Sequence, residues 1–179
     1  GRNLRDARLG KDGVDLVSKL VNAVPFDGKP LDDRDFRNYF LLLVVAGNET
    51  TRHAISHTMN ALIDHPEALA LLQERPDLIP WAVEEFLRWG SPVYHFRRTA
   101  TEDFEFHGKQ VRAGDKVLLW FISGNRDERA FENPFTVNLQ RGINRHLSFG
   151  QGGPHACLGM WLARLEVRLL LQELLARVR

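Results

Sequence analysis

The stretch Phe149-Gly-Gln-Gly-Gly-Pro-His-Ala-Cys157-Leu-Gly159 contains the only cysteine of this 179-residue chain. A glycine-rich loop ends here, and an apolar, helix-forming segment begins at Leu158. The unpaired amides and positive partial charge of a helix N-terminus favour a thiolate over a thiol at Cys157. The four glycines of the stretch remove side chains and allow a large flat ligand to approach the backbone. The stretch therefore predicts a thiolate at the edge of a ligand site.

Other interpretations of this loop compete with the first one. A single cysteine is most often a small buried hydrophobe, and composition alone favours that interpretation. A cysteine nucleophile with His155 as its base is conceivable, but residues two apart rarely adopt the geometry that such a pair needs. A phosphate-binding loop is excluded, because no Gly-Lys-Ser/Thr follows and the glycine spacing misses the dinucleotide fingerprint.

The composition is that of an ordinary globular protein. With 24 Lys+Arg against 23 Asp+Glu, the net charge of +1 gives no general attraction to nucleic acid or to an anionic membrane. One cysteine excludes an internal disulfide framework and a zinc site built from several thiolates. The longest apolar run, residues 40–47, is far shorter than the roughly 20 residues that span a bilayer. The chain begins without a methionine or a signal-peptide pattern, so we expect Gly1 to be a cut inside a longer chain or a processed end.

A long helix is predicted in the first third of the chain. Asp32 and Asp35 resemble a capping box, and apolar residues then recur at helical spacing from Phe36 to Leu62. Pro66 ends the pattern. Such a helix is about 48 Å long, whereas a compact chain of this length has a diameter of roughly 40 Å. We therefore expect the chain to be part of a larger domain.

The remaining sequence predicts shorter elements around an irregular segment. They are a helix near 14–24, helices over 67–73 and 80–89 with Gly90 just after the second, a hairpin over 104–111, a buried strand over 117–122, an ordered coil over 123–156, and a final helix from Leu158 with Leu162, Leu165, Leu169 and Leu170 on one face. A long ordered coil is usually functional.

Two further groups of residues could carry chemistry. Glu85 and Arg88, three apart on a predicted helix, are most often a solvated surface pair, although the bulky residues around them make burial possible. His53 and His57 lie one helical turn apart, but there is no obvious third metal ligand, so we expect a solvated or packed pair.

The long helix contains Ala46-Gly-Asn-Glu-Thr-Thr51 near its middle. Glycine costs about 1 kcal/mol relative to alanine inside a helix, and threonine hydroxyls can further loosen the backbone ladder. The pattern predicts a break in the helix. A break beside a carboxylate and a hydroxyl favours ligand access or proton transfer, and an equally good alternative is a helix–helix contact at a spot with small residues.

In this order and spacing, these stretches resemble the C-terminal part of the cytochrome P-450 family, the haem-thiolate monooxygenases, over residues 31–179. Residues 97–100, 124–127 and 146–150 also look like the bacterial soluble branch of this family. The resemblance implies a mainly α fold with small β-sheets: a long central helix, a Glu-x-x-Arg helix, a meander, a cysteine-ligand loop and a C-terminal helix. Residues 1–179 would be the C-terminal part of a single cytoplasmic domain whose N-terminal part is absent.

The resemblance also implies roles for residues around a haem b group. Cys157 would be the axial ligand of the haem iron. His155 and Arg98 would pair with the haem propionates. Phe149 would shield the sulfur, and Gly47 would leave room for dioxygen over the iron.

Two more sets of roles follow from the same resemblance. Glu85 and Arg88 would form a buried structural triad with Arg141, which binds the meander and performs no chemistry. Glu49 and Thr50 would be the acid–alcohol pair that delivers protons to bound oxygen.

The sequence departs from the family pattern in its loop and its length. Seven residues separate Phe149 from Cys157, where the commonest form of the family has six. We expect a small bulge within Gln151–Pro154 that leaves Cys157 in place. Family members are more than twice as long, so we expect this chain alone to retain haem weakly or not at all.

The implied activity is insertion of one oxygen atom from O2 into an apolar small molecule. Electrons would come from a ferredoxin or flavodoxin type of redox protein with its reductase, docking on the cysteine side at Arg145, Arg164 or Arg168. The motifs look closest to members that act on steroids and methyl-branched lipids, with Val93 and its neighbours lining the pocket. A peroxide-using haem enzyme and a haem-free helical fragment or interaction module are the alternatives.

Overall fold

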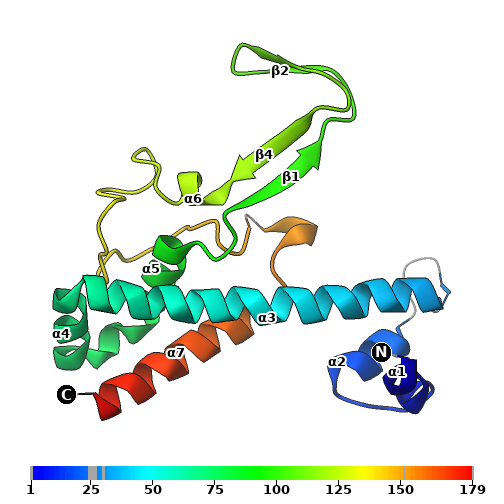
Figure 1. Cartoon of the computed structure of the whole chain (residues 1–179), viewed down its shortest axis with the longest axis horizontal. Coiled ribbons are helices and arrows are strands. Elements are labelled where there is room, and N and C mark those ends of the chain that lie inside the picture. The colour runs from blue at the N-terminus through cyan, green and yellow to red at the C-terminus, as the bar shows by residue number, and fades with distance from the viewer. Residues whose placement is uncertain (1, 24–27, 30, 151, 179) are drawn as a thin grey trace. The chain divides into compact units, whose positions relative to one another are not determined.

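The computed structural model describes residues 2–23, 28–29, 31–150 and 152–178. These residues form helices and two small antiparallel sheets, as the sequence predicts (Figure 1). The elements are α1 (Arg2–Arg8), α2 (Leu16–Val21), α3 (Asp33–Asp64), α4 (Pro66–Glu74), η1 (Pro76–Leu78), α5 (Ile79–Gly90), β1 (His95–Thr99), β2 (Phe104–Phe106), β3 (Lys109–Val111), β4 (Lys116–Trp120), α6 (Phe121–Gly124), η2 (Gly153–His155) and α7 (Met160–Arg177). Within the described ranges, no helix has the length and apolar character needed to cross a membrane.

The chain divides into two compact units, Gly1–Glu49 and Thr50–Arg179. In the first, Asp15 caps α2 by accepting a hydrogen bond from the Ser18 amide at 3.0 Å. The helix expected near 14–24 is therefore shorter than predicted, and its expected end at Val24 lies outside the described residues. Helix α1 was not predicted, because its sequence is polar and shows no clear periodicity.

Helix α3 has the predicted bounds. The Asp32 carboxylate accepts hydrogen bonds from the amides of Arg34 and Asp35, both at 2.8 Å, and Pro66 begins the next helix. The predicted break near Gly47 is wrong, because α3 is continuous from Asp33 to Asp64. A single glycine lowers helix propensity without removing a backbone hydrogen bond, so the flanking turns keep the helix intact.

The apolar core of the second unit lies among α4, α5, α7 and the second half of α3. Its most buried members are Ala54, Ala61, Leu62, Leu72, Ala82, Val83, Phe86, Leu87, Val167 and Leu171. The predicted C-terminal helix is confirmed as α7. Its buried residues are Val167 and Leu171, whereas Leu162, Leu165 and Leu169 of the predicted leucine face are exposed. Leucines surround most of this helix, so periodicity alone did not distinguish its faces.

The C-terminal end of α5 differs from the prediction by one residue. Gly90 is its last helical residue, and Ser91 adopts the left-handed conformation with φ 42°. A Cβ added to Gly90 would lie 2.7 Å from the Cβ of His57 on α3. Glycine is therefore needed here for close packing rather than for a turn.

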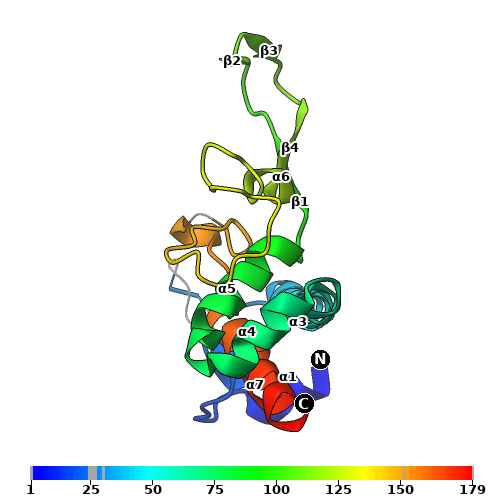
Figure 2. The same ribbon diagram turned by 90° about the vertical axis from the view of Figure 1, so that its left-hand side faces the viewer.

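The two sheets are both two-stranded. β1 pairs with β4, with His95 opposite Trp120, and β2 pairs with β3 through a hairpin at the far end of the β1–β4 ladder (Figure 2). His107 and Gly108, with φ of 49° and 75°, form the hairpin turn, as the sequence predicts. The expected burial of the strand over 117–122 is wrong: β4 is mostly exposed and ends at Trp120, because β1 is its one strand neighbour in the described chain.

Candidate functional site

The cysteine loop closes on itself ahead of α7. The Cys157 amide donates a hydrogen bond to the Phe149 carbonyl at 3.0 Å, which ties together the two ends of the seven-residue segment between them. Gly152 and Gly153 have φ of 88° and 72°, values that favour glycine. Gln151, one residue of the expected bulge, lies outside the described residues.

Cys157 is exposed, and the backbone around it carries few side chains. A Cβ added to Gly152, Gly153 or Gly159 would meet no atom of the described residues within 4 Å. Helix α7 begins at Met160, three residues after the cysteine. A soft sulfur ligand bordered by open backbone fits a flat ligand that presents a metal ion. Haem has these properties.

Glu85, Arg88 and Arg141 lie together in the interior. Arg88 donates from Nε and Nη2 to the two Glu85 oxygens at 2.9 and 2.8 Å, and Arg141 Nε donates to Glu85 Oε2 at 3.0 Å. The side chains of Glu85 and Arg88 are 1% and 0% exposed, so this is not a solvated surface pair. Burial alone would raise the pKa of Glu85, but the hydrogen bonds from both arginines lower it below its ordinary value.

Arg88 also holds the backbone of the irregular coil. Its guanidinium donates to the carbonyls of Asn125 at 2.8 Å, Pro134 at 2.8 Å and Thr136 at 3.0 Å. A buried carbonyl needs a hydrogen-bond partner, and here a side chain supplies it in place of a sheet or helix. The coil is therefore ordered without periodic structure.

Asn125, a residue with no predicted role, is fully buried. Its amide nitrogen donates to the hydroxyls of Ser91 at 2.8 Å and Ser148 at 3.1 Å, and its oxygen accepts from the Leu147 amide at 2.6 Å. Asn125 thus joins the end of α5 to the residues that lead into the cysteine loop. The sequence signal that could have pointed to Asn125 is its position as a polar residue directly after Gly124.

Arg164 is not the exposed cation that the sequence analysis expected. It donates to Glu84 at 2.7 and 2.9 Å, and its side chain is 26% exposed. Arg145 and Arg168 are exposed. The carboxylate that pairs with Arg164 belongs to Glu84, 80 residues away in sequence. Helical spacing does not reveal such a partner.

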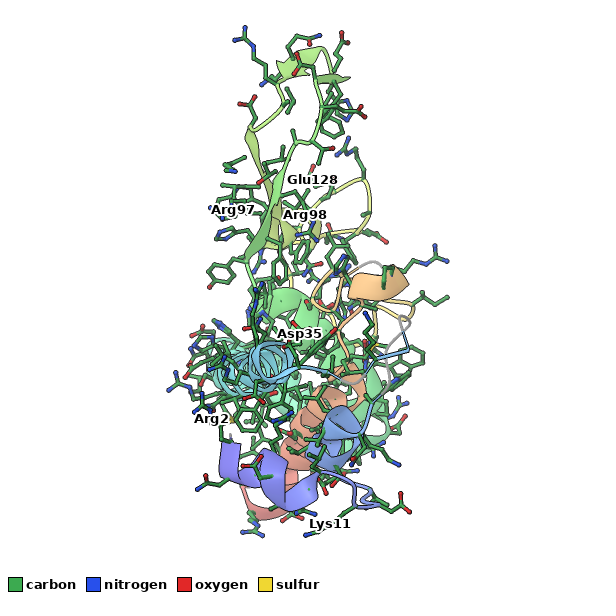
Figure 3. All side chains as sticks on the ribbon, turned by 90° about the vertical axis from the view of Figure 1, so that its right-hand side faces the viewer. Arg2, Lys11, Asp35, Arg97, Arg98 and Glu128 are labelled. Atoms are coloured by element: carbon green, nitrogen blue, oxygen red, sulfur yellow. The ribbon has the colours of Figure 1, made fainter. Side chains whose placement is uncertain are left out.

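The structure does not bring the two expected propionate partners together. Arg98 is exposed on β1, donates to the Arg97 carbonyl at 3.1 Å and lies 5.9 Å from the Phe96 ring (Figure 3). His155 is exposed within η2. Within the described ranges, no contact joins Arg98 to His155.

The remaining predicted residues lie on α3. Gly47, Glu49 and Thr50 fall within one turn of this helix. His53 and His57 form a packed pair, with ring centroids 6.4 Å apart. In the part of the chain that the structure describes, no group of three His, Cys, Asp or Glu side chains could hold a metal ion.

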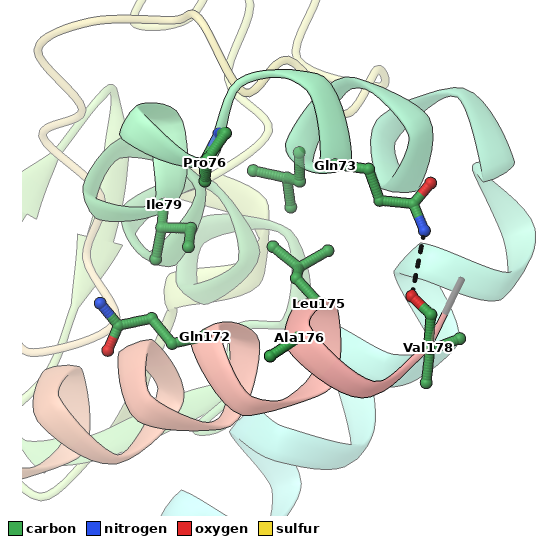
Figure 4. Close-up of a pocket in the computed structure, with 8 residues that line it drawn as sticks. Gln73, Pro76, Ile79, Gln172, Leu175, Ala176 and Val178 are labelled. Carbon is green, nitrogen blue, oxygen red and sulfur yellow. Dashed lines mark hydrogen bonds between the residues drawn. The ribbon is translucent and has the colours of Figure 1, made fainter.

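An apolar hollow lies at the opposite end of α7 from the cysteine. It is lined mainly by residues of α4, η1 and α7, and Gln73 Nε2 donates to the Val178 carbonyl at 3.3 Å across it (Figure 4). The 18 residues of α7 span about 27 Å. This hollow is therefore separate from the cysteine site.

Comparison with known proteins gives a consistent result. Residues 2–179 match the family model described as Cytochrome P450. The chain is 52% identical over 161 residues to a methyl-branched lipid omega-hydroxylase of Mycobacterium tuberculosis, covering 89% of this chain and 37% of that protein. It is 44% identical over 168 residues to a steroid C26-monooxygenase of Rhodococcus jostii, covering 93% and 35%.

A solved structure shares the fold. The structure of a Mycobacterium marinum cytochrome P450 in complex with pseudoionone has a TM-score of 0.90 and 47% sequence identity, covering 99% of this chain and 43% of that one. The chain spans little more than a third of the length of the curated relatives that it matches. The predicted P450 fold is confirmed for this portion.

Proposed function

Because the chain belongs to the cytochrome P450 family, we propose that its protein is a haem-thiolate monooxygenase that hydroxylates an apolar organic substrate. The observation that carries this proposal is the exposed Cys157 in glycine-bordered, open space ahead of α7. The family holds its haem iron by a cysteine thiolate. Cys157 is the only cysteine of the chain and therefore the residue proposed as this ligand.

Bound haem supplies an iron centre that activates O2, and the thiolate donates electron density that favours O–O cleavage. His155 and Arg98 are proposed to bind the propionates through charge-assisted hydrogen bonds. Phe149 is proposed to shield the sulfur, which fits the hydrogen bond between its carbonyl and the Cys157 amide. Glu85, Arg88 and Arg141 keep the coil in place from the interior.

On α3, Glu49 and Thr50 are proposed to hold and transfer the protons that the reduction of O2 would consume. They are adjacent on one helical turn, and Gly47 on the same turn leaves free space beside the helix. An acid and an alcohol on this turn could each pass protons toward a ligand beside Gly47. Peroxide brings its own protons, so this pair favours the oxygen route over a peroxide-using enzyme.

The proton relay is tested with T50A in the haem-loaded protein that contains this chain. The share of reductant electrons that end in hydroxylated product is expected to fall, with more peroxide released, because proton delivery is worth about 100-fold or more in rate. T51A, which removes the neighbouring hydroxyl, is the matched control. Equal product yields from T50A and T51A would contradict the relay, and full turnover with peroxide alone would favour the peroxide-using alternative.

The proposed substrate class is a methyl-branched lipid or a steroid. It is supported by the activities for which the two relatives are named, omega-hydroxylation of methyl-branched lipids and C26 oxidation of steroids. Val93, Tyr94 and His95, which follow α5, are proposed to line the pocket. A spectral shift of the haem on adding such a lipid is expected, and a binding screen that finds only small polar ligands would contradict this class.

The proposed electron donor is a cytoplasmic ferredoxin or flavodoxin that docks on the cysteine side. Arg145 and Arg168 are exposed and able to meet acidic groups, whereas Arg164 is paired with Glu84. Such steering is screened by salt. R168E is expected to slow electron transfer most at low ionic strength, and a rate unaffected at any salt concentration would remove Arg168 from the docking surface.

A further inference from the structure

Glu84 precedes the buried Glu85 on α5 but takes part in a different set of contacts. Successive helical residues point about 100° apart. Glu85 contacts Arg88 and Arg141, whereas Glu84 contacts Arg164 of α7 and His146 of the coil. Three segments distant in sequence therefore meet at the Glu84 carboxylate.

Two side chains, Arg164 and His146, hold the Glu84 carboxylate, and these three residues are called the clamp below. Arg164 donates from Nε to Oε1 at 2.7 Å and from Nη2 to Oε2 at 2.9 Å, a fork that fixes orientation as well as distance. His146 Nε2 lies 3.1 Å from Oε2, while His146 Nδ1 accepts from the Ser148 amide at 3.2 Å. The second bond leaves the proton on Nε2, so His146 donates to Glu84.

Both partners of Glu84 also contact Phe149. The Arg164 guanidinium carbon lies 4.6 Å from the centroid of the Phe149 ring, and the His146 ring centroid lies 5.7 Å from it. The Phe149 carbonyl in turn accepts the Cys157 amide at 3.0 Å. A continuous series of contacts thus runs from the Glu84 carboxylate to the backbone of the cysteine.

The cluster is shielded from water more than an ordinary surface ion pair. The side chains of His146, Glu84 and Arg164 are 2%, 22% and 26% exposed. Burial opposes ionisation of Glu84, but the hydrogen bonds from His146 and Arg164 lower its pKa to about 2. The carboxylate is therefore charged when it holds both partners.

We propose that Glu84 is a positioning residue for the Cys157 thiolate, acting through Arg164, His146 and Phe149. The inference rests on the proposed function, in which Cys157 ligates the haem iron. Arg164 and His146 brace the Phe149 ring from two elements, and this fixes the carbonyl that orients the Cys157 amide. Loss of the clamp frees the start of the loop and weakens the hold on the sulfur. Outer groups of this kind tune metal ligands in other proteins.

A second ion pair on α7 provides a matched control. Glu173 accepts from Arg177 at 2.7 Å, and the two side chains are 66% and 76% exposed. Like Glu84, Glu173 pairs with an arginine of α7, but its partner lies one turn away on the same helix. The substitution E173Q therefore removes a carboxylate charge without touching the cysteine loop.

The experiment measures the ferrous–CO spectrum and the iron reduction potential of the haem-loaded protein that contains this chain. In E84Q, the ratio of thiol-ligated to thiolate-ligated species is expected to rise about tenfold, the size typical of losing an outer partner of a metal ligand. The potential is expected to rise, because a loosened thiolate donates less electron density. R164K keeps the charge but loses the fork and the stacking, so it is expected to change both readouts in the same direction.

The outcomes separate this inference from the proposed function. The inference is supported if the wild type shows a thiolate spectrum, E84Q and R164K alter that spectrum, and E173Q leaves it unchanged. Should E84Q fail to take up haem, R164K decides the question by the same two readouts. Wild-type ratios and potentials in E84Q and R164K would overturn the positioning role alone. A wild-type protein without a thiolate spectrum would overturn both the inference and the proposed function.

Discussion

At the scale of single residues, the guanidinium of Arg88 holds the coil in place from the interior. It bonds both oxygens of Glu85 and three carbonyls of the coil from a fully buried position. A lysine supplies a point charge and cannot reproduce this fork. R88K is therefore expected to lower the free energy of unfolding by about 3–5 kcal/mol, as measured by urea denaturation.

The control for R88K is R129K. Arg129 makes a similar fork with Asp127, but its side chain is 89% exposed. Exposed pairs contribute little to stability, so R129K is expected to unfold like the wild type. Equal midpoints for R88K and R129K would show that the buried network does not stabilise the chain.

Glu84 gives a pH prediction at the same scale. Its folded-state pKa of about 2 lies below the ordinary 4.5. The stabilisation is therefore complete above the unfolded pKa and is lost as the pH falls toward the folded pKa. The difference in unfolding free energy between wild type and E84Q is expected to be about 2 kcal/mol at neutral pH and to vanish near pH 2. A difference that does not change with pH would contradict the assignment.

At the scale of elements, two helical glycines are expected to respond in opposite directions to alanine. Gly47 on α3 meets no described atom within 4 Å of an added Cβ, so G47A is expected to stabilise by up to about 1 kcal/mol. A Cβ added to Gly90 on α5 would lie 2.7 Å from the Cβ of His57, so G90A is expected to destabilise by about 1–3 kcal/mol. Thermal unfolding of both variants provides the measurement. Stabilisation by G90A would contradict the close crossing.

The ends of helices could be predicted from the sequence where local chemistry sets them. Which residues are buried could not be predicted in this way. Asp32 and Pro66 bound α3 through a cap and a missing amide, and both signals are local. The buried face of α7 depends on which leucines α5 covers, and the exposure of β4 depends on its neighbours. These are tertiary facts, which periodicity does not contain.

At the scale of the whole molecule, the order of motifs predicted the family before any contact was known. The contacts that those motifs make with distant residues could not be predicted from the sequence. Glu84 reaches His146 and Arg164 across 62 and 80 residues, and Asn125 reaches Leu147 across 22. Arg98 and His155 are exposed without a mutual contact among the described residues, so their joint role stays a prediction. Pairings of this kind arise only when the fold brings distant segments together.

The central claim is that Cys157 is the thiolate ligand of haem iron, and its most direct test is the reduced carbon monoxide difference spectrum. It is measured on the haem-loaded protein that contains this chain, as wild type and as C157S. We predict a strongly red-shifted band, diagnostic of thiolate ligation, in the wild type and its complete loss in C157S. A band that persists in C157S, or no such band in the wild type, would contradict the account.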